Sequence, residues 1–129
     1  MTLVVTSGVL EALLAEARSV HPRECCGLLF GEAGAITAHR AAANVHREPE
    51  THFEIDPQAL IDAHRAMREG GPQLAGYYHS HPCGPPEPSA TDQALSAGDR
   101  MIWAIVAQGE VRLWRAAPHG FTALSYAAV

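Results

Sequence analysis

The segment 77–92, YYHSHPCGPPEPSATD, constrains this chain more than any other part of the sequence. An apolar run ends there in two histidines, and alternate residues of a β-strand point to the same side of a sheet. His79 and His81 can therefore direct their imidazole nitrogens at one point, while Ser80 points away. Pro82 ends the strand, and the prolines that follow reduce the conformational freedom of the loop.

A carboxylate joins the two histidines through the next helix. Ser89 is predicted to cap a short helix, which places Asp92 in its first turn, near the end of the strand. Two imidazoles and one carboxylate are common zinc ligands, at distances of about 2.0–2.2 Å. Because three protein ligands leave one tetrahedral position open, we expect a catalytic zinc site, with one Zn²⁺ per chain, at His79, His81 and Asp92.

Each part of this pattern also has a simpler explanation. A His-x-His at a strand end usually consists of two partly exposed side chains. Ser89 and Asp92 form a capping box, which satisfies backbone N–H groups without any ion. Cys83 lies between His81 and Asp92 in the sequence. It is assigned to the loop, because two histidines and one aspartate already provide three zinc ligands. The parts taken together, in this order, favour a metal site.

The whole chain, residues 1–129, predicts a single α/β domain with a mixed, curved sheet, two main helices and one short helix. The main helices are expected at 7–20, capped by Ser7, and at 57–68, capped by Asp56. Their inward stripes are expected to be Leu10, Leu13, Leu14 and Ala17, and Leu60, Ile61, His64 and Met67. The short helix should begin at Ser89 and be closed by Gly98. Strands are expected at 2–6, 25–32, 35–45, 52–55, 73–81, 101–107, 110–116 and 121–127, the last three as an antiparallel meander.

Composition excludes several classes of function. The net charge of -5 argues against nucleic-acid binding, which needs a basic face. No segment approaches the roughly 20 apolar residues of a membrane span, and the N-terminus has no basic region typical of a signal peptide. Three cysteines do not form a disulfide framework, so we expect a cytoplasmic protein without a membrane partner.

Hydrolysis at a zinc site needs a general base that can later protonate the leaving amine. The histidine strand carries no carboxylate, so the base must come from elsewhere. We favour Glu24, because it begins an apolar strand, ECCGLLFG, and burial at a strand end raises the pKa of a carboxyl group. The candidates are Glu24, Glu32, Glu48, Glu54 and Glu87.

In these residues the chain resembles the JAMM, or MPN-plus, family of zinc metallopeptidases. The matching segments are PRECCGLLFG at 22–31, NVHREPETHFEIDP at 44–57 and GYYHSHPCGPPEPSATD at 76–92. The resemblance implies a JAMM-type, cytidine deaminase-like fold. It also implies that His79, His81 and Asp92 bind zinc.

The resemblance gives roles to two further residues. Glu24 would deprotonate the zinc-bound water, the nucleophile, and pass that proton to the departing nitrogen. Ser89 would donate a hydrogen bond to the carbonyl oxygen as it becomes an oxyanion. Every position of the family motif is filled in this sequence.

Family members cleave isopeptide or peptide bonds after the C-terminal Gly-Gly of ubiquitin or ubiquitin-like proteins. This short chain is similar to small stand-alone bacterial members, which are associated with sulfur-carrier proteins. The resemblance therefore implies a ubiquitin-like or sulfur-carrier substrate, in a groove flanked by residues 46–52 and 83–88. Whether the chain forms a homodimer is left open.

Two other functions are compatible with a zinc site. One is a zinc amidohydrolase or deaminase that acts on a small molecule, although Pro82-Cys83 lacks the second cysteine of the deaminase pattern. The other is a non-catalytic, zinc-containing module that binds a carrier protein. Exchange of Glu24 for glutamine separates the hydrolase from the binding module, because only the hydrolase needs that carboxylate.

Overall fold

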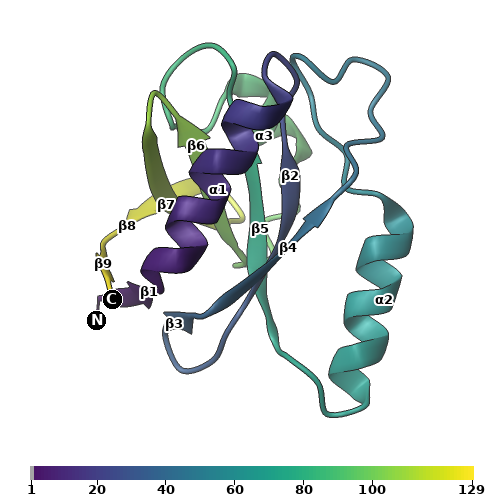
Figure 1. The fold of residues 1–129 in the computed structure, drawn as a ribbon, viewed down its shortest axis with the longest axis vertical. Coiled ribbons are helices and arrows are strands. Elements are labelled where there is room, and N and C mark those ends of the chain that lie inside the picture. Colours follow the sequence, from purple (N-terminus) through teal and green to yellow (C-terminus); the bar gives the residue numbers. More distant parts are fainter. Residues whose placement is uncertain (1) are drawn as a thin grey trace.

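The computed structural model describes residues 2–129, which build a six-stranded mixed sheet and a smaller three-stranded sheet (Figure 1). The order of the larger sheet is β4-β2-β5-β6-β7-β8, with β5 and β6 parallel and all other neighbours antiparallel. The predicted mixed sheet is thereby confirmed. Its strands are β2 (Cys26–Phe30), β4 (Ala38–Ala42), β5 (Leu74–Ser80), β6 (Ile102–Ala107), β7 (Glu110–Ala117) and β8 (Gly120–Leu124).

The smaller sheet accounts for two of the three strand predictions that are wrong. It consists of β3 (Ala35–Ile36), β1 (Leu3–Val5) and β9 (Tyr126–Ala128), with both outer strands parallel to β1. The predicted strands 35–45 and 121–127 are each divided, because one half pairs in each sheet. The predicted strand 52–55 is also wrong, since only an isolated bridge from Asn44 to Ile55 forms there.

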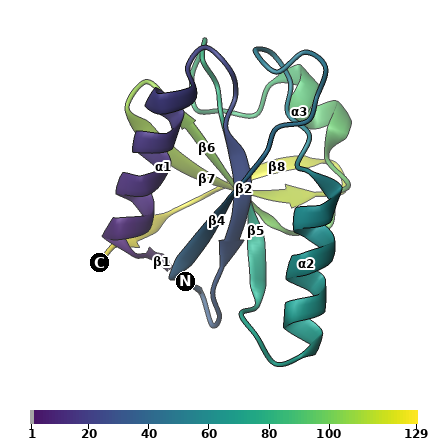
Figure 2. The same ribbon diagram turned by 45° about the vertical axis from the view of Figure 1, so that its right-hand side comes forward.

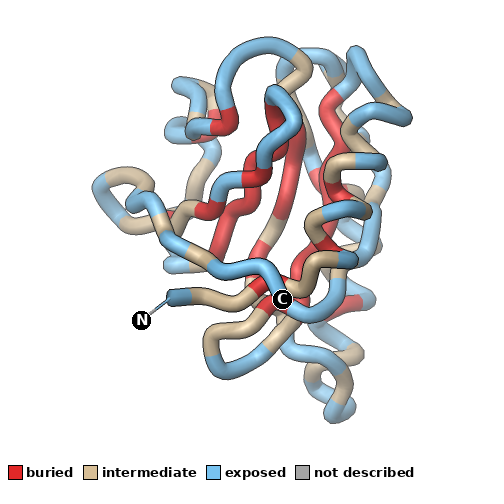
Figure 3. Tube along the Cα trace, turned by 60° about the vertical axis from the view of Figure 1, so that its left-hand side comes forward, coloured by how far each residue is buried: buried red, intermediate tan, exposed pale blue. Residues whose placement is uncertain are grey.

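Helices α1 (Ser7–Val20) and α2 (Pro57–Arg68) lie on opposite sides of the large sheet (Figure 2). Each covers a separate apolar cluster, because successive side chains of a strand point to opposite faces. Cys25 belongs to the cluster under α1 and Cys26 to the cluster under α2. Buried residues follow the central strands, and the exposed ones lie mainly in the loops (Figure 3).

The helix boundaries hold, but some details differ from the prediction. The cap of α1 is Thr6 rather than Ser7, and no side chain bonds the first turn. Asp56 caps α2 as predicted, since its side chain accepts from the backbone N–H of Gln58 at 3.1 Å. On α1 the predicted stripe is confirmed, because all four residues belong to or pack against the core.

Helix α2 turns a different face to the sheet than predicted. Ala63 is buried, and Leu60 and Met67 are half-buried, whereas Ile61 and His64 are exposed. Residues 60, 63 and 67 share one helical face, and residues 61 and 64 lie on its flank. The short helix α3 (Ala90–Leu95) ends before Gly98, with Ser96 as its C-terminal cap.

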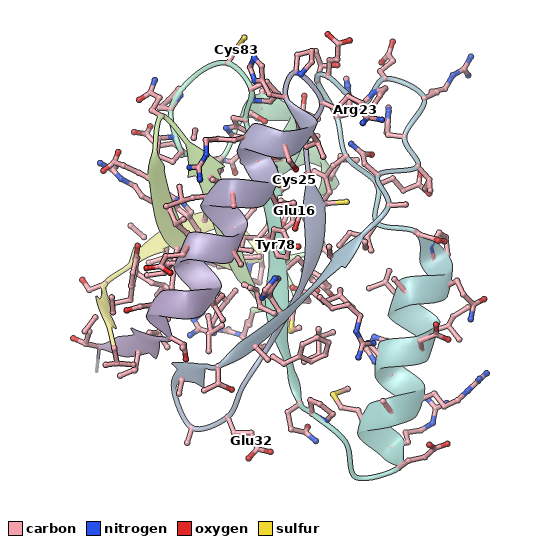
Figure 4. The ribbon with its side chains drawn as sticks, viewed as in Figure 1. Glu16, Arg23, Cys25, Glu32, Tyr78 and Cys83 are labelled. Carbon is pink, nitrogen blue, oxygen red and sulfur yellow. The ribbon has the colours of Figure 1, made fainter. Side chains whose placement is uncertain are left out.

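One close approach fixes β2 against β5. A Cβ atom on Gly27 would lie 2.5 Å from the ring of Tyr78, so only glycine fits beneath that ring. The Tyr78 hydroxyl donates to Oε1 of Glu16 at 2.7 Å, which ties α1 to the centre of the sheet (Figure 4). Within residues 2–129, no helix has both the length and the apolar character needed to cross a membrane.

Candidate metal centre

His79, His81 and Asp92 converge at the end of β5. The Nε2 atoms of the two histidines lie 3.2 Å apart, and each lies 3.0–3.2 Å from a carboxylate oxygen of Asp92. Ligands at about 2.05 Å from a tetrahedral zinc ion are separated by about 3.3 Å, so these separations fit one ion. His79 and Asp92 are buried, and His81 is partly exposed.

The surroundings of His81 orient it as a ligand. Its Nδ1 atom lies 2.9 Å from the carbonyl oxygen of Pro85, which can only accept, so Nδ1 carries the proton. The lone pair of Nε2 then faces His79 and Asp92. A second ring nitrogen held by a backbone carbonyl is the usual arrangement of a metal-bound histidine.

Packing of aromatic rings orients the imidazole of His79. The Phe53 ring stacks on its imidazole at a centroid distance of 4.2 Å, and the Trp103 ring meets it edge-on at 5.5 Å. Its Nδ1 atom is buried and has no hydrogen-bond partner among the described residues. Burial lowers the pKa of His79, which favours the neutral imidazole that binds a metal ion.

Asp92 serves two structural roles at once. Its Oδ2 atom accepts from the backbone N–H of Ser89 at 2.9 Å, and its own N–H donates to Ser89 Oγ at 3.0 Å. The predicted capping box is therefore present, together with the contacts to both histidines. Burial raises the pKa of Asp92, but the opposing influence of the adjacent His79, His81 and Ser89 N–H is larger, so the pKa is lowered and this carboxylate stays ionised.

Glu24 lies two residues before β2 and is only 6% exposed. Its backbone is fixed at both ends, because its N–H donates to the carbonyl of Pro49 at 2.7 Å and its carbonyl accepts from Asn44 Nδ2 at 3.1 Å. Burial raises the pKa of Glu24 to about 7, against the opposing influence of His81. A carboxyl group with that pKa can both accept and donate a proton near neutral pH.

The proposed catalytic side chains share one pocket of about 230 Å³, which we call the reactive pocket. Glu24, His81 and Ser89 line it from three different segments of the chain. The other lining residues are Glu50, Thr51, Pro82, Cys83 and Thr91. The two loops predicted to flank a groove, 46–52 and 83–88, thus both contribute residues that line the reactive pocket.

The remaining candidate bases lie elsewhere. Glu32 follows β2 at the opposite end from Glu24, and Glu54 lines an apolar pocket beside Leu60 and Trp103. Glu87 pairs with Arg112 at 3.8 Å. None of these lines the reactive pocket, so Glu24 is the candidate that the geometry supports.

A second cluster of ligand-type side chains consists of His46, Glu48 and His52, which we call the loop cluster. Sequence reasoning considered Glu48 as a base and residues 46–52 as a flank of the groove, but it did not consider these three side chains as a metal site. The backbone N–H of Glu48 donates to His46 Nδ1 at 3.0 Å, so the free lone pair of that ring is already used. The rings of His46 and His52 stack at an interplanar angle of 10°, and lone pairs in parallel rings cannot meet at one ion.

Sequence reasoning also missed the side chains that support the site. Ser80 Oγ accepts from the backbone N–H of Cys25 at 2.8 Å, and the Cys25 carbonyl accepts from the Ser80 N–H at 3.1 Å. These bonds join the start of β2, beside Glu24, to the strand of the two histidines. A neighbouring-strand contact of this kind carries no signal in a single sequence.

Comparison with known proteins agrees with this geometry. The model of the family described as prokaryotic homologs of the JAB domain matches residues 6–117. The chain is 36% identical over 86 residues to a desampylase of Haloferax volcanii, an alignment that covers 65% of this chain and 62% of that protein. It is 33% identical over 96 residues to the CysO-cysteine peptidase of Mycobacterium tuberculosis, covering 73% of this chain and 65% of that one. The chain thus spans less than two thirds of either relative.

Two solved structures are similar in fold. The solution structure of protein DSY2949 from Desulfitobacterium hafniense has a TM-score of 0.83 and 28% identity, covering 99% of this chain and 93% of that one. A JAB1/MPN domain protein from Archaeoglobus fulgidus has a TM-score of 0.64 and 19% identity, covering 99% and 97%, which supports the fold alone. The resemblance to the JAMM family is thus confirmed, and the chain belongs to the prokaryotic homologs of the JAB domain.

Proposed function

We propose that this chain is a zinc-dependent JAMM hydrolase that cleaves the amide bond after the C-terminal Gly-Gly of a ubiquitin-like or sulfur-carrier protein. The proposal rests on one observation above all. Two histidine nitrogens and a carboxylate lie within 3.2 Å of one another beside a pocket that also holds a buried glutamate and a serine hydroxyl. The printed names of the relatives, a desampylase and a CysO-cysteine peptidase, point to carrier conjugates.

His79, His81 and Asp92 would hold one zinc ion per chain. A zinc ion bound by three protein ligands supplies a Lewis acid that polarises a carbonyl group and lowers the pKa of water. Burial of His79 lowers its pKa and favours its neutral form, and the bond from His81 Nδ1 to Pro85 leaves the Nε2 atom of that ring to face the other two ligands. The Asp92 carboxylate supplies negative charge that offsets that of the cation.

Glu24 would move the proton. It takes a proton from the attacking water, whose oxygen forms a bond to the glycine carbonyl carbon. It then gives that proton to the nitrogen as the carbon–nitrogen bond breaks, so that an amine and a carboxylic acid are formed, and the acid loses the second proton of the water to solvent. Burial raises the pKa of Glu24 to about 7, which suits both transfers.

Ser89 would stabilise the oxyanion. Its Oγ atom accepts from the N–H of Asp92, and this leaves the hydroxyl proton available for the substrate. The side chain is exposed and lines the reactive pocket. Helix capping and oxyanion stabilisation use different parts of the hydroxyl group, so they are compatible.

The reactive pocket favours a substrate with small residues at the scissile bond. Loops 46–52 and 83–88 approach it from two sides, and its volume of about 230 Å³ leaves little room for bulky side chains. An extended Gly-Gly tail meets this requirement. The same proposal includes a single domain over residues 1–129 and a cytoplasmic location. It applies to a monomer and to a homodimer.

Mass spectrometry of carrier proteins tests the proposal. Ubiquitin-like carriers with C-terminal extensions are incubated with zinc-loaded protein, and the products are weighed. We expect loss of mass immediately after Gly-Gly, and no loss with Glu24→Gln. Equal cleavage by both proteins would remove Glu24 from the mechanism. Turnover of small amides without cleavage of any carrier would favour the amidohydrolase, and zinc-dependent carrier binding without turnover would favour the binding module.

A further inference from the structure

Asn44 is the only asparagine in the chain, and it has no role in the mechanism above. It follows β4, whose antiparallel register with β2 pairs Ala42 with Cys26. Continuing that register by two residues places Asn44 opposite Glu24, beyond the point where the backbone ladder between the two strands ends. The side chain of Asn44 therefore lies next to the backbone of the proposed base.

The side-chain amide of Asn44 uses its full hydrogen-bonding capacity. Its Nδ2 atom donates to the carbonyl oxygens of Glu24 at 3.1 Å and of His52 at 3.0 Å. Its Oδ1 atom accepts from the backbone N–H groups of His46 at 3.1 Å and of Glu54 at 3.0 Å. Because a carbonyl only accepts and a backbone N–H only donates, these partners require an amide in this orientation, and a carboxylate cannot replace it.

Two of these bonds fix the base and the loop beside it. The carbonyl of Glu24 accepts from Asn44, and its N–H donates to the carbonyl of Pro49 at 2.7 Å, so its backbone is held from both sides. Pro49 belongs to loop 46–52, which begins at a second partner of the amide, His46, and contributes residues to the reactive pocket. The position of Glu24 and the loop that lines the pocket therefore depend on the same side chain.

The other two bonds relate Asn44 to the candidate metal ligands. His52 and Glu54 flank Phe53 in the chain, so this amide holds the backbone on both sides of the phenylalanine. The Phe53 ring stacks on the imidazole of His79 at a centroid distance of 4.2 Å. One side chain thus bonds both the backbone of the base and the backbone around a residue that packs on a metal ligand.

We propose that Asn44 is a positioning residue that fixes Glu24 relative to the candidate metal ligands. This role rests on the proposed hydrolysis, because that reaction makes the position of Glu24 important. A general base acts only within hydrogen-bond reach of the water that it deprotonates, and a displacement of about 1 Å can lower a rate by about 10²-fold. Asn44 does not line the reactive pocket, so it acts through the backbone of Glu24 and not on the substrate.

Asn44→Asp tests this role, because it keeps the shape of the side chain and removes both donors. We expect one zinc per chain, a fall in kcat of roughly tenfold to hundredfold and a smaller change in KM. In the Glu24→Gln background the same change should lower kcat by about twofold or less, because residues that act as a unit are not additive. Gln58→Glu makes the same chemical change at an exposed site on α2 and should keep the wild-type kcat. An unchanged kcat in Asn44→Asp, or an equal loss with and without Glu24, overturns the proposal.

Hydrogen exchange separates this role from the proposed hydrolysis, because it needs no substrate. Since the chain has one asparagine, zinc-loaded protein labelled with ¹⁵N-asparagine shows a single side-chain amide of this type by NMR. We expect its two protons to exchange at least about tenfold more slowly than in an unfolded peptide, because both are bonded within a network that must open first. Exchange at the rate of the peptide overturns the proposal without any variant.

The same measurement on Asn44→Asp follows the base itself. The backbone N–H of Glu24 should exchange faster than in the wild type, whereas that of Leu29, in the middle of β2, should not change. Unchanged exchange at Glu24 overturns the proposal. Faster exchange at Glu24 alone, in a protein whose wild type cleaves no carrier, supports the positioning role and counts against the proposed hydrolysis.

Discussion

Two clusters of histidine and carboxylate side chains occur among residues 2–129, and they differ in the contacts that orient them. His79, His81 and Asp92 are mostly buried, and the bond from His81 to Pro85 leaves a lone pair directed at the centre of the cluster. In the loop cluster, His46 uses its lone pair on a backbone N–H, and its ring stacks on that of His52. Proximity of ligand-type residues is therefore not enough. Burial and packing at His79, and the hydrogen bond from Nδ1 at His81, decide whether the nitrogens converge.

The largest expected difference follows from removing one carboxylate in each cluster. Asp92→Asn should lose stoichiometric zinc and all measurable turnover, because it removes the negative ligand but keeps an oxygen that can cap α3. Glu48→Gln in the loop cluster should keep one zinc per chain. Metal analysis after dialysis, together with the carrier assay, measures both effects. Retention of tightly bound zinc by Asp92→Asn would place the ion elsewhere.

The next largest effect concerns the base. Glu24→Gln should lower kcat by about 10²–10⁴, because general acid–base catalysis by one side chain has this magnitude. Zinc content should stay at the wild-type level, since Glu24 is not in the candidate metal group. Glu32→Gln is the control, a change of an exposed glutamate at the other end of β2. A similar loss in both variants would argue for a general effect on folding.

Ser89 separates oxyanion stabilisation from helix capping. Ser89→Ala removes both, whereas Ser89→Asp can still accept from the Asp92 N–H but cannot donate while ionised. We expect kcat to fall by about 10²-fold or more in both variants, as for other oxyanion donors. The melting temperature should fall more in Ser89→Ala. Full activity of Ser89→Asp would show that the hydroxyl proton of Ser89 is not needed to stabilise the oxyanion.

The buried Glu24 also predicts a dependence of stability on pH in the metal-free protein. Burial raises its pKa from 4.5 to about 7, so between these values the native chain holds a proton that the unfolded chain has released. Raising the pH through this range therefore favours unfolding. Melting temperatures measured in the presence of a chelator should fall from about pH 5 to about pH 8 in the wild type, and fall less in Glu24→Gln. If the melting temperatures of the wild type and Glu24→Gln changed in parallel with pH, ionisation of Glu24 would not destabilise the native protein.

The smallest effect is expected at the loop cluster. His46→Gln with His52→Gln should leave one zinc per chain and change stability by about 1 kcal/mol or less, because both side chains are partly exposed. Calorimetric zinc titration of this double variant beside the wild type measures the number of bound ions, and denaturant unfolding of the two proteins measures the difference in stability. A drop from two bound ions to one would show that the loop cluster binds metal after all.

The sequence predicted the site better than it predicted the edges of the fold. The convergence of His79, His81 and Asp92 followed from strand alternation and a capping box, which are local rules that survive folding. The division of residues 35–45 between two sheets did not follow, because pairing with β1 and β2 depends on contacts distant in sequence. The face of α2 was misjudged at Ile61 and His64 for the same reason.

The contacts that support the site were also beyond sequence reasoning. Phe53 stacks on His79 from a loop, and Pro49 holds the backbone of Glu24 from the same loop. Neither contact has a fixed spacing to the residue it supports. Glu24 itself could be predicted because it begins an apolar strand and lies in a segment that resembles the JAMM family.

Anomalous diffraction at the zinc edge, from crystals of the zinc-loaded protein, tests the central claim most directly. We predict one strong peak within about 2.2 Å of Nε2 of His79, Nε2 of His81 and a carboxylate oxygen of Asp92. A peak at the loop cluster with none at these three atoms would contradict the account, as would a protein that binds no zinc.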